Sequence, residues 1–296
     1  MSTAFVKEFY PAIGVPEETI PYFNYYSSVL DDDERFHAVV ERFMAQDGTS
    51  VNDILAEIAA LSEEKGLHPY TGHFIFYAFC AEIMLAKYRK RGIDEEIFWD
   101  SNRDLTWKCR ECLECHGIPG TSVGDWHADF YRLRRFALGR LQYEHRGFPY
   151  PEYTKAGITI KKGDDVLNVH IPSCGPLTPE KRMDSYRRAW EFYHKEFKDD
   201  VVPIGCSSWL LFKGHEDFLP PTSNILGFLH DFDMQSSGED ERFSNAWRVF
   251  GRYAKYPPEA WPRNTSIRRA FADRILSGGK TGHGYGIFLF DGEKKL

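Results

Sequence analysis

The sequence has no long hydrophobic run. Its strongest apolar stretch, Phe74 to Tyr88, spans 15 residues and contains Glu82, whereas a membrane-spanning helix needs about 20 predominantly apolar residues. Residues 1–20 hold no uninterrupted apolar core of the kind a secretory signal requires, because charged residues break them up: Lys7, Glu8, Glu17 and Glu18. These absences predict a buried helix near 74–88, no membrane partner and a cytoplasmic protein.

An excess of positive charge is also missing. The 37 Lys and Arg stand against 44 Asp and Glu, for a net charge of −7. A general nucleic-acid binder carries a basic surface, so we expect no nucleic-acid partner, and the basic run 87–91 is interpreted as the solvated end of a helix. Cysteine is sparse, with six in 296 residues. Without an export signal, these cysteines are expected to be free thiols.

Three of the cysteines form a pattern with a histidine. Cys109, Cys112, Cys115 and His116 include the C-x-x-C-H spacing of c-type haem attachment. Haem attachment requires export, and no second Cys/His cluster at zinc-like spacing completes a four-ligand site. Cysteines at i, i+3 and i+6 of a helix are commonly semi-buried small hydrophobes. We therefore expect no metal and no haem, with a metal or Fe–S site as the alternative.

What is present is an ordinary globular composition with many aromatics. Hydrophobic residues make up 42%, charged residues 27% and aromatics 16%, which excludes disorder and indicates a large aromatic core or a deep apolar pocket. The length predicts two domains or one large one. Before residue 130 the pattern is helical, with a capped helix from Ser50 to Gly66, a turn at 68–72, the apolar helix and a helix over 94–116.

After residue 130 the pattern predicts strands and helices in alternation. The Lys162–Asp165 turn predicts a hairpin joining strands 158–161 and 166–171. Thr178 as N-cap and Pro179 at the first helical position begin an amphipathic helix. Further expected strands are 138–145, 204–211, 242–251 and 284–290, and further expected helices are 223–232 and 265–276.

The segment 169–180 combines a strand end, a Pro/Gly loop and a capped helix. A helix start of this kind offers free N–H groups and a favourable dipole to an anion. An ordinary strand-to-helix loop, with His170 as a structural histidine, is the alternative interpretation.

The order of these elements is similar to the GNAT acyltransferase fold. Five segments resemble a bacterial family that joins a helical N-acyltransferase N-terminal domain to a GNAT-like C-terminal domain: 138–144, 168–173, 206–211, 223–225 and 262–270. The resemblance implies an α+β (α/β) fold, with a helical domain over 1–130 and a twisted mixed β-sheet flanked by helices over 131–296. It also implies acyl transfer from acetyl-CoA or another acyl-CoA to an amine of a small molecule or peptide.

The resemblance places the acyl donor at the loop after strand 166–171. GNAT enzymes grip the CoA pyrophosphate with Gln/Arg-x-x-Gly-x-Gly/Ala, whereas this chain has Ser173-Cys-Gly-Pro-Leu-Thr178. Backbone N–H groups alone could hold the pyrophosphate, the donor could differ, or catalysis could be lost, leaving a ligand- or protein-binding module. The expected donor-binding residues are Ile171, Ser173, Gly175, Leu177 and Thr178.

Aminolysis of a thioester needs a base for the ammonium proton and a donor for the leaving sulfur. Arg140, Gln142 and Glu144 share one strand face, and Asn168 and His170 share another. We expect Glu144 or His170 to act as general base, directly or through a water, and Cys206 or Ser207 to donate to the leaving sulfur. The alternative is that this polar face is the solvent side of the sheet.

Overall fold

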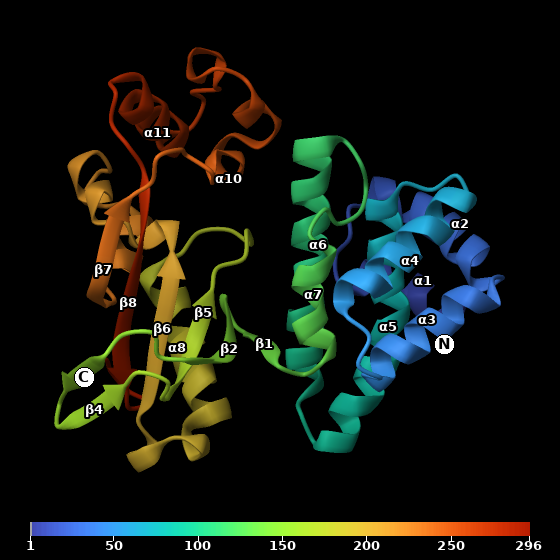
Figure 1. The fold of residues 1–296 in the computed structure, drawn as a ribbon, viewed down its shortest axis with the longest axis horizontal. Helices are drawn as coiled ribbons and strands as arrows, with labels where there is room; N and C mark the ends of the chain where they lie inside the picture. Colours follow the sequence, from blue (N-terminus) through green and yellow to red (C-terminus); the bar gives the residue numbers. More distant parts are fainter. Residues whose placement is uncertain (1) are drawn as a thin grey trace. The chain divides into compact units, whose positions relative to one another are not determined.

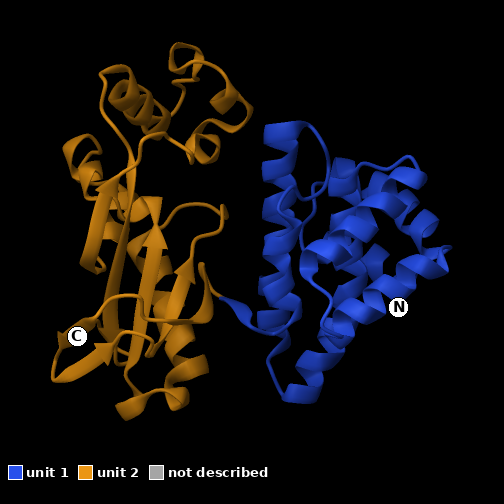
Figure 2. Cartoon of the chain, viewed as in Figure 1, with its two compact units in different colours: residues 1–137 blue, residues 138–296 orange. Residues whose placement is uncertain are grey.

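The computed structural model describes residues 2–296, and the chain forms two compact units, 1–137 and 138–296 (Figure 2). The predicted fold class is confirmed, because a helical N-terminal region precedes a mixed sheet flanked by helices (Figure 1). Within residues 2–296, no helix is long and apolar enough to cross a membrane.

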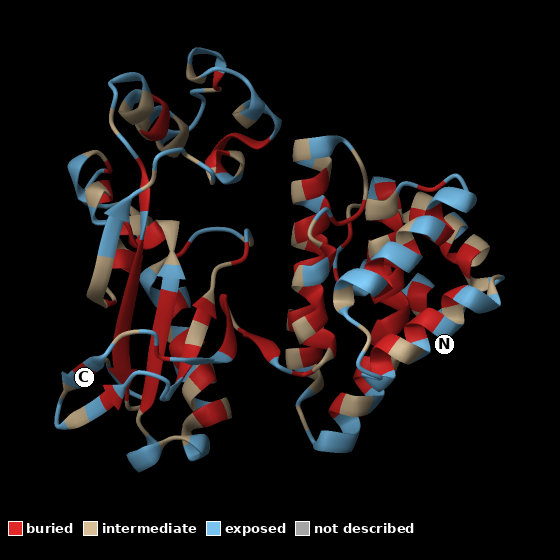
Figure 3. Ribbon diagram, viewed as in Figure 1, coloured by how far each residue is buried: buried red, intermediate tan, exposed pale blue. Residues whose placement is uncertain are grey.

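The first unit is built on helices around a buried central one. They are α1 Thr3–Ala12, α2 Ile20–Asp31, α3 Glu34–Ala45, α4 Val51–Glu64, α5 Pro69–Arg91, α6 Glu95–His116 and α7 Gly124–Tyr131. In α5, every residue from Phe74 to Ala81 is fully buried (Figure 3), as expected of a helix that is apolar on all sides. The predicted turn at 68–72 is wrong. His68 is the N-cap of α5, and its Nδ1 accepts the N–H of Tyr70 at 3.1 Å.

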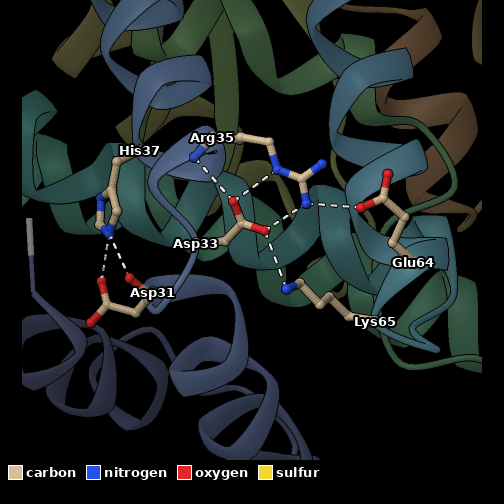
Figure 4. A network of polar contacts seen from close by, with 6 residues as sticks. All are labelled: Asp31, Asp33, Arg35, His37, Glu64 and Lys65. Atoms are coloured by element: carbon tan, nitrogen blue, oxygen red, sulfur yellow. Dashed lines mark hydrogen bonds and ion pairs between the residues drawn. The ribbon is translucent and has the colours of Figure 1, made fainter.

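A polar network fastens α3 to its neighbours (Figure 4). Asp33 caps α3 by accepting the N–H of Arg35 at 3.0 Å, and its carboxylate also binds the Arg35 guanidinium at 3.0 and 2.8 Å. Arg35 reaches Glu64 at 2.8 Å, and Lys65 reaches Asp33 at 3.2 Å. These contacts hold the pKa of Asp33 well below its usual range, chiefly through the Arg35 hydrogen bond.

The second unit contains most of a six-stranded sheet in the order β1-β2-β5-β6-β8-β7, and a separate two-stranded sheet, β3-β4. The strands are β1 Arg135–Leu138, β2 Leu141–Gly147, β3 Glu152–Lys155, β4 Ile158–Lys161, β5 Asp165–His170, β6 Val202–Ser208, β7 Asp233–Glu239 and β8 Gly282–Phe290. The helices of this unit are α8 Pro179–Tyr193, α9 Asn224–Leu229, α10 Ala246–Phe250 and α11 Ser266–Leu276.

The predicted hairpin between 158–161 and 166–171 is wrong. β4 pairs with β3, whereas β5 pairs with β2 and β6, so the Lys162–Asp165 turn leads the chain from one sheet into the other. The partner of β4 is β3, a strand that the pattern did not predict. It turns back through Ala156 and Gly157, both with positive φ, which is the geometry of a two-residue type I′ hairpin.

The two faces of the large sheet have different covers. Tyr143 and Tyr186 connect α8 to one face: the Tyr143 hydroxyl lies 3.0 Å from Ser185 Oγ, and the Tyr186 ring packs edge-on to Phe288. The β3-β4 hairpin covers part of the opposite face through a small apolar cluster of Phe148, Tyr153, Ile160, Val166, Tyr285, Ile287 and Leu289. Along β5 beyond Val166, this second face of the sheet carries polar side chains.

A helical insertion separates β7 from β8. The predicted strand 242–251 is wrong, because α10 occupies 246–250. The predicted strand 204–211 stops at Ser208, where a single 3₁₀ turn, Trp209–Leu211, begins. That turn lies against Gly284 of β8, where a Cβ would be 2.3 Å from the Leu211 carbonyl oxygen. Close packing therefore excludes side chains there.

Candidate active site

Two neighbouring parallel strands part at the middle of the large sheet. β5 and β6 are in register only at Leu167 with Ile204 and at Asn168 with Gly205. β5 continues to pair with β2 as far as His170, and β6 continues to pair with β8 as far as Ser208. The two strands expected over 166–171 and 204–211 are therefore neighbours in one sheet, and their pairing stops at Asn168.

Polar side chains gather on one face beside this opening. In the antiparallel register of β2 and β5, Gln142 lies opposite His170 and Glu144 lies opposite Asn168. Residues directly opposite project to the same face, so the sheet brings the four side chains together. Glu144 is only 4% exposed, which contradicts the alternative that its strand face is simply the solvent side of the sheet.

Glu144 and His170 are in direct contact. His170 Nε2 lies 3.0 Å from Glu144 Oε1 and 3.1 Å from Asn168 Nδ2. Arg146, on the same face of β2, binds the same carboxylate oxygen through Nε at 2.7 Å. An unprotonated Nε2 would accept the Asn168 amide N–H, whereas an Nε2 that carries the proton donates to the Glu144 carboxylate, which is the stronger, charged partner and favours that tautomer. Nδ1 then carries the lone pair that can accept a proton.

The two candidate donors on β6 point in opposite directions. Ser207 is exposed and shares its face with Gly205 and Asn168, because strand side chains alternate with period two. Cys206 lies on the face covered by α8. It is fully buried, and its thiol donates to the Val169 carbonyl at 3.6 Å. Burial raises the pKa of Cys206. The structure therefore brings Ser207 to the side of Glu144 and His170 and separates Cys206 from them.

The β5–α8 loop, residues 171–178, is organised around Arg140. The guanidinium is 8% exposed and donates to the carbonyls of Pro172 at 2.9 Å, Gly175 at 2.6 Å and Pro176 at 3.4 Å. Desolvation lowers the pKa of Arg140. No carboxylate forms an ion pair with it in the described chain. A buried positive charge therefore lies directly beneath a loop that contains no basic residue.

Several N–H groups of the loop are left without an acceptor in the described part of the chain. The loop turns sharply at Gly175, whose φ of +108° favours glycine. Within residues 2–296, the amides of Gly175, Leu177 and Thr178 have no hydrogen-bond acceptor. Thr178 caps α8 by accepting the Lys181 N–H, as predicted. Ile171, Thr178 and Ser173 are at least partly exposed, whereas Leu177 is buried.

Two features of the site were missed by reasoning from the sequence. The clamp between Arg140 and the loop joins residues 32 to 36 apart, for which the sequence carries no local signal. Arg146 could have been found, because Glu144-x-Arg146 on a strand places both side chains on one face.

The remaining cysteine motif has no metal-site geometry. All six cysteines are free thiols, and Cys109 and Cys112 are fully buried in α6. Burial raises the pKa of Cys109 to about 11 and that of Cys112 to about 12. Within the described residues, no three His, Cys, Asp or Glu side chains are grouped to hold a metal ion.

Comparison with solved structures finds acyltransferases. The chain is similar to an acyltransferase in complex with decanoyl-CoA, with a TM-score of 0.74 and 21% identity over 95% of this chain and 86% of that one. It is also similar to an acyltransferase in complex with decanoyl-CoA and teicoplanin (0.69, 19%, 95% and 86%), and to one in complex with CoA and 10C-teicoplanin (0.62, 19%, 97% and 99%). At these identities the likeness concerns the fold. No curated protein matches the sequence.

Family models match both halves of the chain. Residues 4–133 match the N-acyltransferase N-terminal domain, and residues 135–288 match the GNAT-like C-terminal domain. The second match alone covers more than half of the chain. This protein therefore belongs to the family that joins an N-acyltransferase N-terminal domain to a GNAT-like C-terminal domain.

Proposed function

We propose that the protein transfers an acyl group from an acyl-CoA to an amine by direct attack. The observation that carries the proposal is the end of β5–β6 pairing at Asn168, beside the contact between Glu144 and His170. Past that point β5 has no further backbone pairing with β6, which suits the amides of a pantetheine arm. The family membership and the CoA-bound acyltransferases of similar fold support it.

The β5–α8 loop is the proposed grip on the pyrophosphate. Its free amides and the positive end of α8 attract anions, and Arg140 adds a full charge from beneath. Glu180, in the first turn of α8, keeps a lowered pKa through hydrogen bonds with its own backbone N–H and with Thr178. We place the pyrophosphate over the amides of Gly175, Leu177 and Thr178, on the side of the loop away from that carboxylate. Ser173 and Ile171 complete the proposed donor site.

His170 is the proposed general base, because it is more accessible than Glu144 and its Nε2 is held by that carboxylate. The amine attacks the thioester carbonyl while His170 takes its proton, directly or through a water. A C–N bond forms and the C–S bond breaks; the leaving thiolate accepts a hydrogen bond from the Ser207 hydroxyl, and the proton that His170 took from the amine passes to the sulfur or to solvent. Glu144 stabilises the imidazolium. Cys206 has no part in the proposed chemistry, because its thiol is buried on the opposite face.

The proposed acceptor is an amine on a small molecule or peptide; two of the acyltransferases of similar fold are in complex with teicoplanin or 10C-teicoplanin. The test begins with the donor. Acetyl-, octanoyl- and decanoyl-CoA should raise the melting temperature, and thiol release should then be followed against a panel of small-molecule and peptide amines, with teicoplanin included. Failure of every CoA thioester to shift the melting temperature would remove the proposal.

A further inference from the structure

The insertion between β7 and β8, residues 240–281, is far longer than the sheet requires. Glu239 and Gly282 are partners in the antiparallel register, and two such strands can be joined by a two-residue turn. Instead the chain builds α10, α11 and short 3₁₀ turns on a core that the insertion shares with the segment before β7: Leu219, Leu226, Ala246, Val249, Phe250, Trp261, Phe271 and Ala272. We call residues 240–281 the cap.

The charge of the cap is opposite to that of the whole protein. It holds nine Lys or Arg against four Asp or Glu, a balance of +5 in a chain whose net charge is −7. Several of these cations are exposed without a carboxylate. Arg242, Lys255 and Arg269 form no ion pair within residues 2–296. The net charge of the whole chain does not reveal this positive charge, because the acidic residues outside the cap more than offset it.

The cap also exposes apolar side chains. Of the four large hydrophobic residues that stand exposed in the described chain, three lie in the cap: Tyr253 at 44%, Tyr256 at 48% and Leu276 at 45%. A hollow of about 320 Å³ also opens between the starts of α9 and α11, and its lining is part apolar and part polar. Arginine together with exposed aromatic side chains is typical of protein interfaces.

The cap lies at the same edge of the sheet as the β5–α8 loop (Figure 1). β5 and β6 are parallel, so the loop leaves β5 at the edge where β6 ends. Ser208, at the end of β6, pairs with Gly284 near the start of β8, directly after the cap. A molecule that contacts the cap is therefore at the edge where the proposed donor enters.

We propose that the cap is the docking surface for an acidic carrier protein that presents the acyl group on a phosphopantetheine arm. The inference rests on the proposed acyl transfer and specifies its donor. CoA and such a carrier share the phosphopantetheine thioester, which the opening between β5 and β6 would hold in either case. The cap adds what a nucleotide does not need: unpaired cations spread from Arg242 to Arg269 and exposed tyrosines over a rigid core.

The test measures binding and transfer separately. The probe is an acyl carrier protein of fatty-acid synthesis, fluorescently labelled and charged with decanoate, and its binding is followed by anisotropy. The variant is Arg242→Glu/Lys255→Glu/Arg269→Glu. The matched control, Lys7→Glu/Lys90→Glu/Arg91→Glu, makes the same change of charge at exposed sites in the first unit. Circular dichroism and melting temperature confirm that both variants fold.

We expect the cap variant to weaken carrier binding about tenfold or more, with kcat/KM for decanoyl-carrier falling in parallel and that for decanoyl-CoA unchanged. The control variant should bind as the wild type does, and added salt should weaken wild-type binding. Equal losses with carrier and CoA, or no loss with either, would overturn the docking proposal. Carrier binding without transfer from any thioester would refute the proposed function and leave the docking surface standing.

Discussion

Replacement of Arg140 by methionine tests whether a buried charge beneath the β5–α8 loop holds the donor's phosphates. The guanidinium donates to three loop carbonyls at 2.6, 2.9 and 3.4 Å. Gly175 and Pro176 are exposed, so water can replace Arg140 at their carbonyls. Pro172 is buried, and its carbonyl loses a partner at a cost of about 1–3 kcal/mol of folding free energy.

Loss of the Arg140 charge should weaken donor binding by removing an electrostatic attraction to the phosphates. A phosphate on the outer side of a single layer of loop backbone would lie roughly 7 Å from the guanidinium. With an effective dielectric constant of about 20, one such charge pair contributes about 2 kcal/mol, equivalent to about a thirtyfold change in Kd. Pantetheine lacks the pyrophosphate and the nucleotide, so its affinity should not depend on this charge.

Calorimetry with CoA and with pantetheine separates the two effects. Arg140→Met should raise the Kd for CoA about thirtyfold and leave the Kd for pantetheine unchanged. The Kd of Arg140→Lys for CoA should lie between those of the wild type and Arg140→Met, because lysine keeps the positive charge but lacks the planar set of guanidinium donors. Arg188→Met removes an exposed charge from α8 as the control. Equal losses for CoA and pantetheine, or an unchanged CoA affinity in Arg140→Met, would refute the reasoning.

Three further predictions follow from the remaining geometry. His170→Ala should lower kcat about 10²–10⁴-fold with the Kd for acyl-CoA unchanged, and Glu144→Gln should lower it less; wild-type turnover in either single variant would remove that residue's role, as measured by thiol release. Cys206 should resist alkylation in the folded protein, because it is fully buried and its pKa is raised, while the partly exposed Cys115 and Cys174 react; mass spectrometry of peptides after a brief iodoacetamide pulse checks this, and early labelling of Cys206 would contradict its placement. Asp33→Ala should lower the free energy of unfolding by about 0.5–2 kcal/mol at neutral pH, through loss of the α3 cap. Because the pKa of Asp33 is lowered in the folded state, its stabilisation is complete above the unfolded pKa of about 3.9 and is lost as the pH falls below that value. Urea titrations should therefore show the difference in stability from the wild type shrinking in acid, and a constant difference would count against the network.

The sequence predicted those elements whose local pattern and tertiary role agree. The cap of α4 is an example, because Ser50 accepts the Asp53 N–H at 3.1 Å, as its spacing predicted. The start of α8 at Thr178 is another. The hairpin after β4 was mispredicted for a physical reason: a tight turn specifies a reversal of direction, whereas the partner strand is chosen by side-chain packing far along the chain. β7 was not predicted at all, and its short residues Ser236, Ser237 and Gly238 give little alternation to detect.

The sequence predicted which polar residues lie on a shared strand face, but not which of them are in contact. Period-two alternation placed Glu144 and His170 on faces of their own strands, yet the register that brings them 3.0 Å apart depends on which strands pair. The same alternation could have separated Cys206 from Ser207, because adjacent strand residues point to opposite faces. The prediction that Arg140 shares a strand face with Gln142 and Glu144 is wrong, because the expected strand 138–145 is broken by a turn at Gly139 and Arg140 between β1 and β2. The attachment of Arg140 to a loop 32 residues further on is a tertiary feature without a sequence pattern.

The buried Cys206 also makes a contact between β6 and β5, the two strands that border the proposed site. Its thiol donates to the Val169 carbonyl, the first β5 peptide past the last paired residue, Asn168. At 3.6 Å, this contact joins a β6 side chain to the β5 backbone directly beyond the end of the β5–β6 pairing. Direct backbone pairing at Val169 would move the end of the ladder toward His170 and narrow the entrance for a pantetheine arm. The thiol therefore lies at the base of the opening on the face that α8 covers, and Ser207 lies on the opposite face.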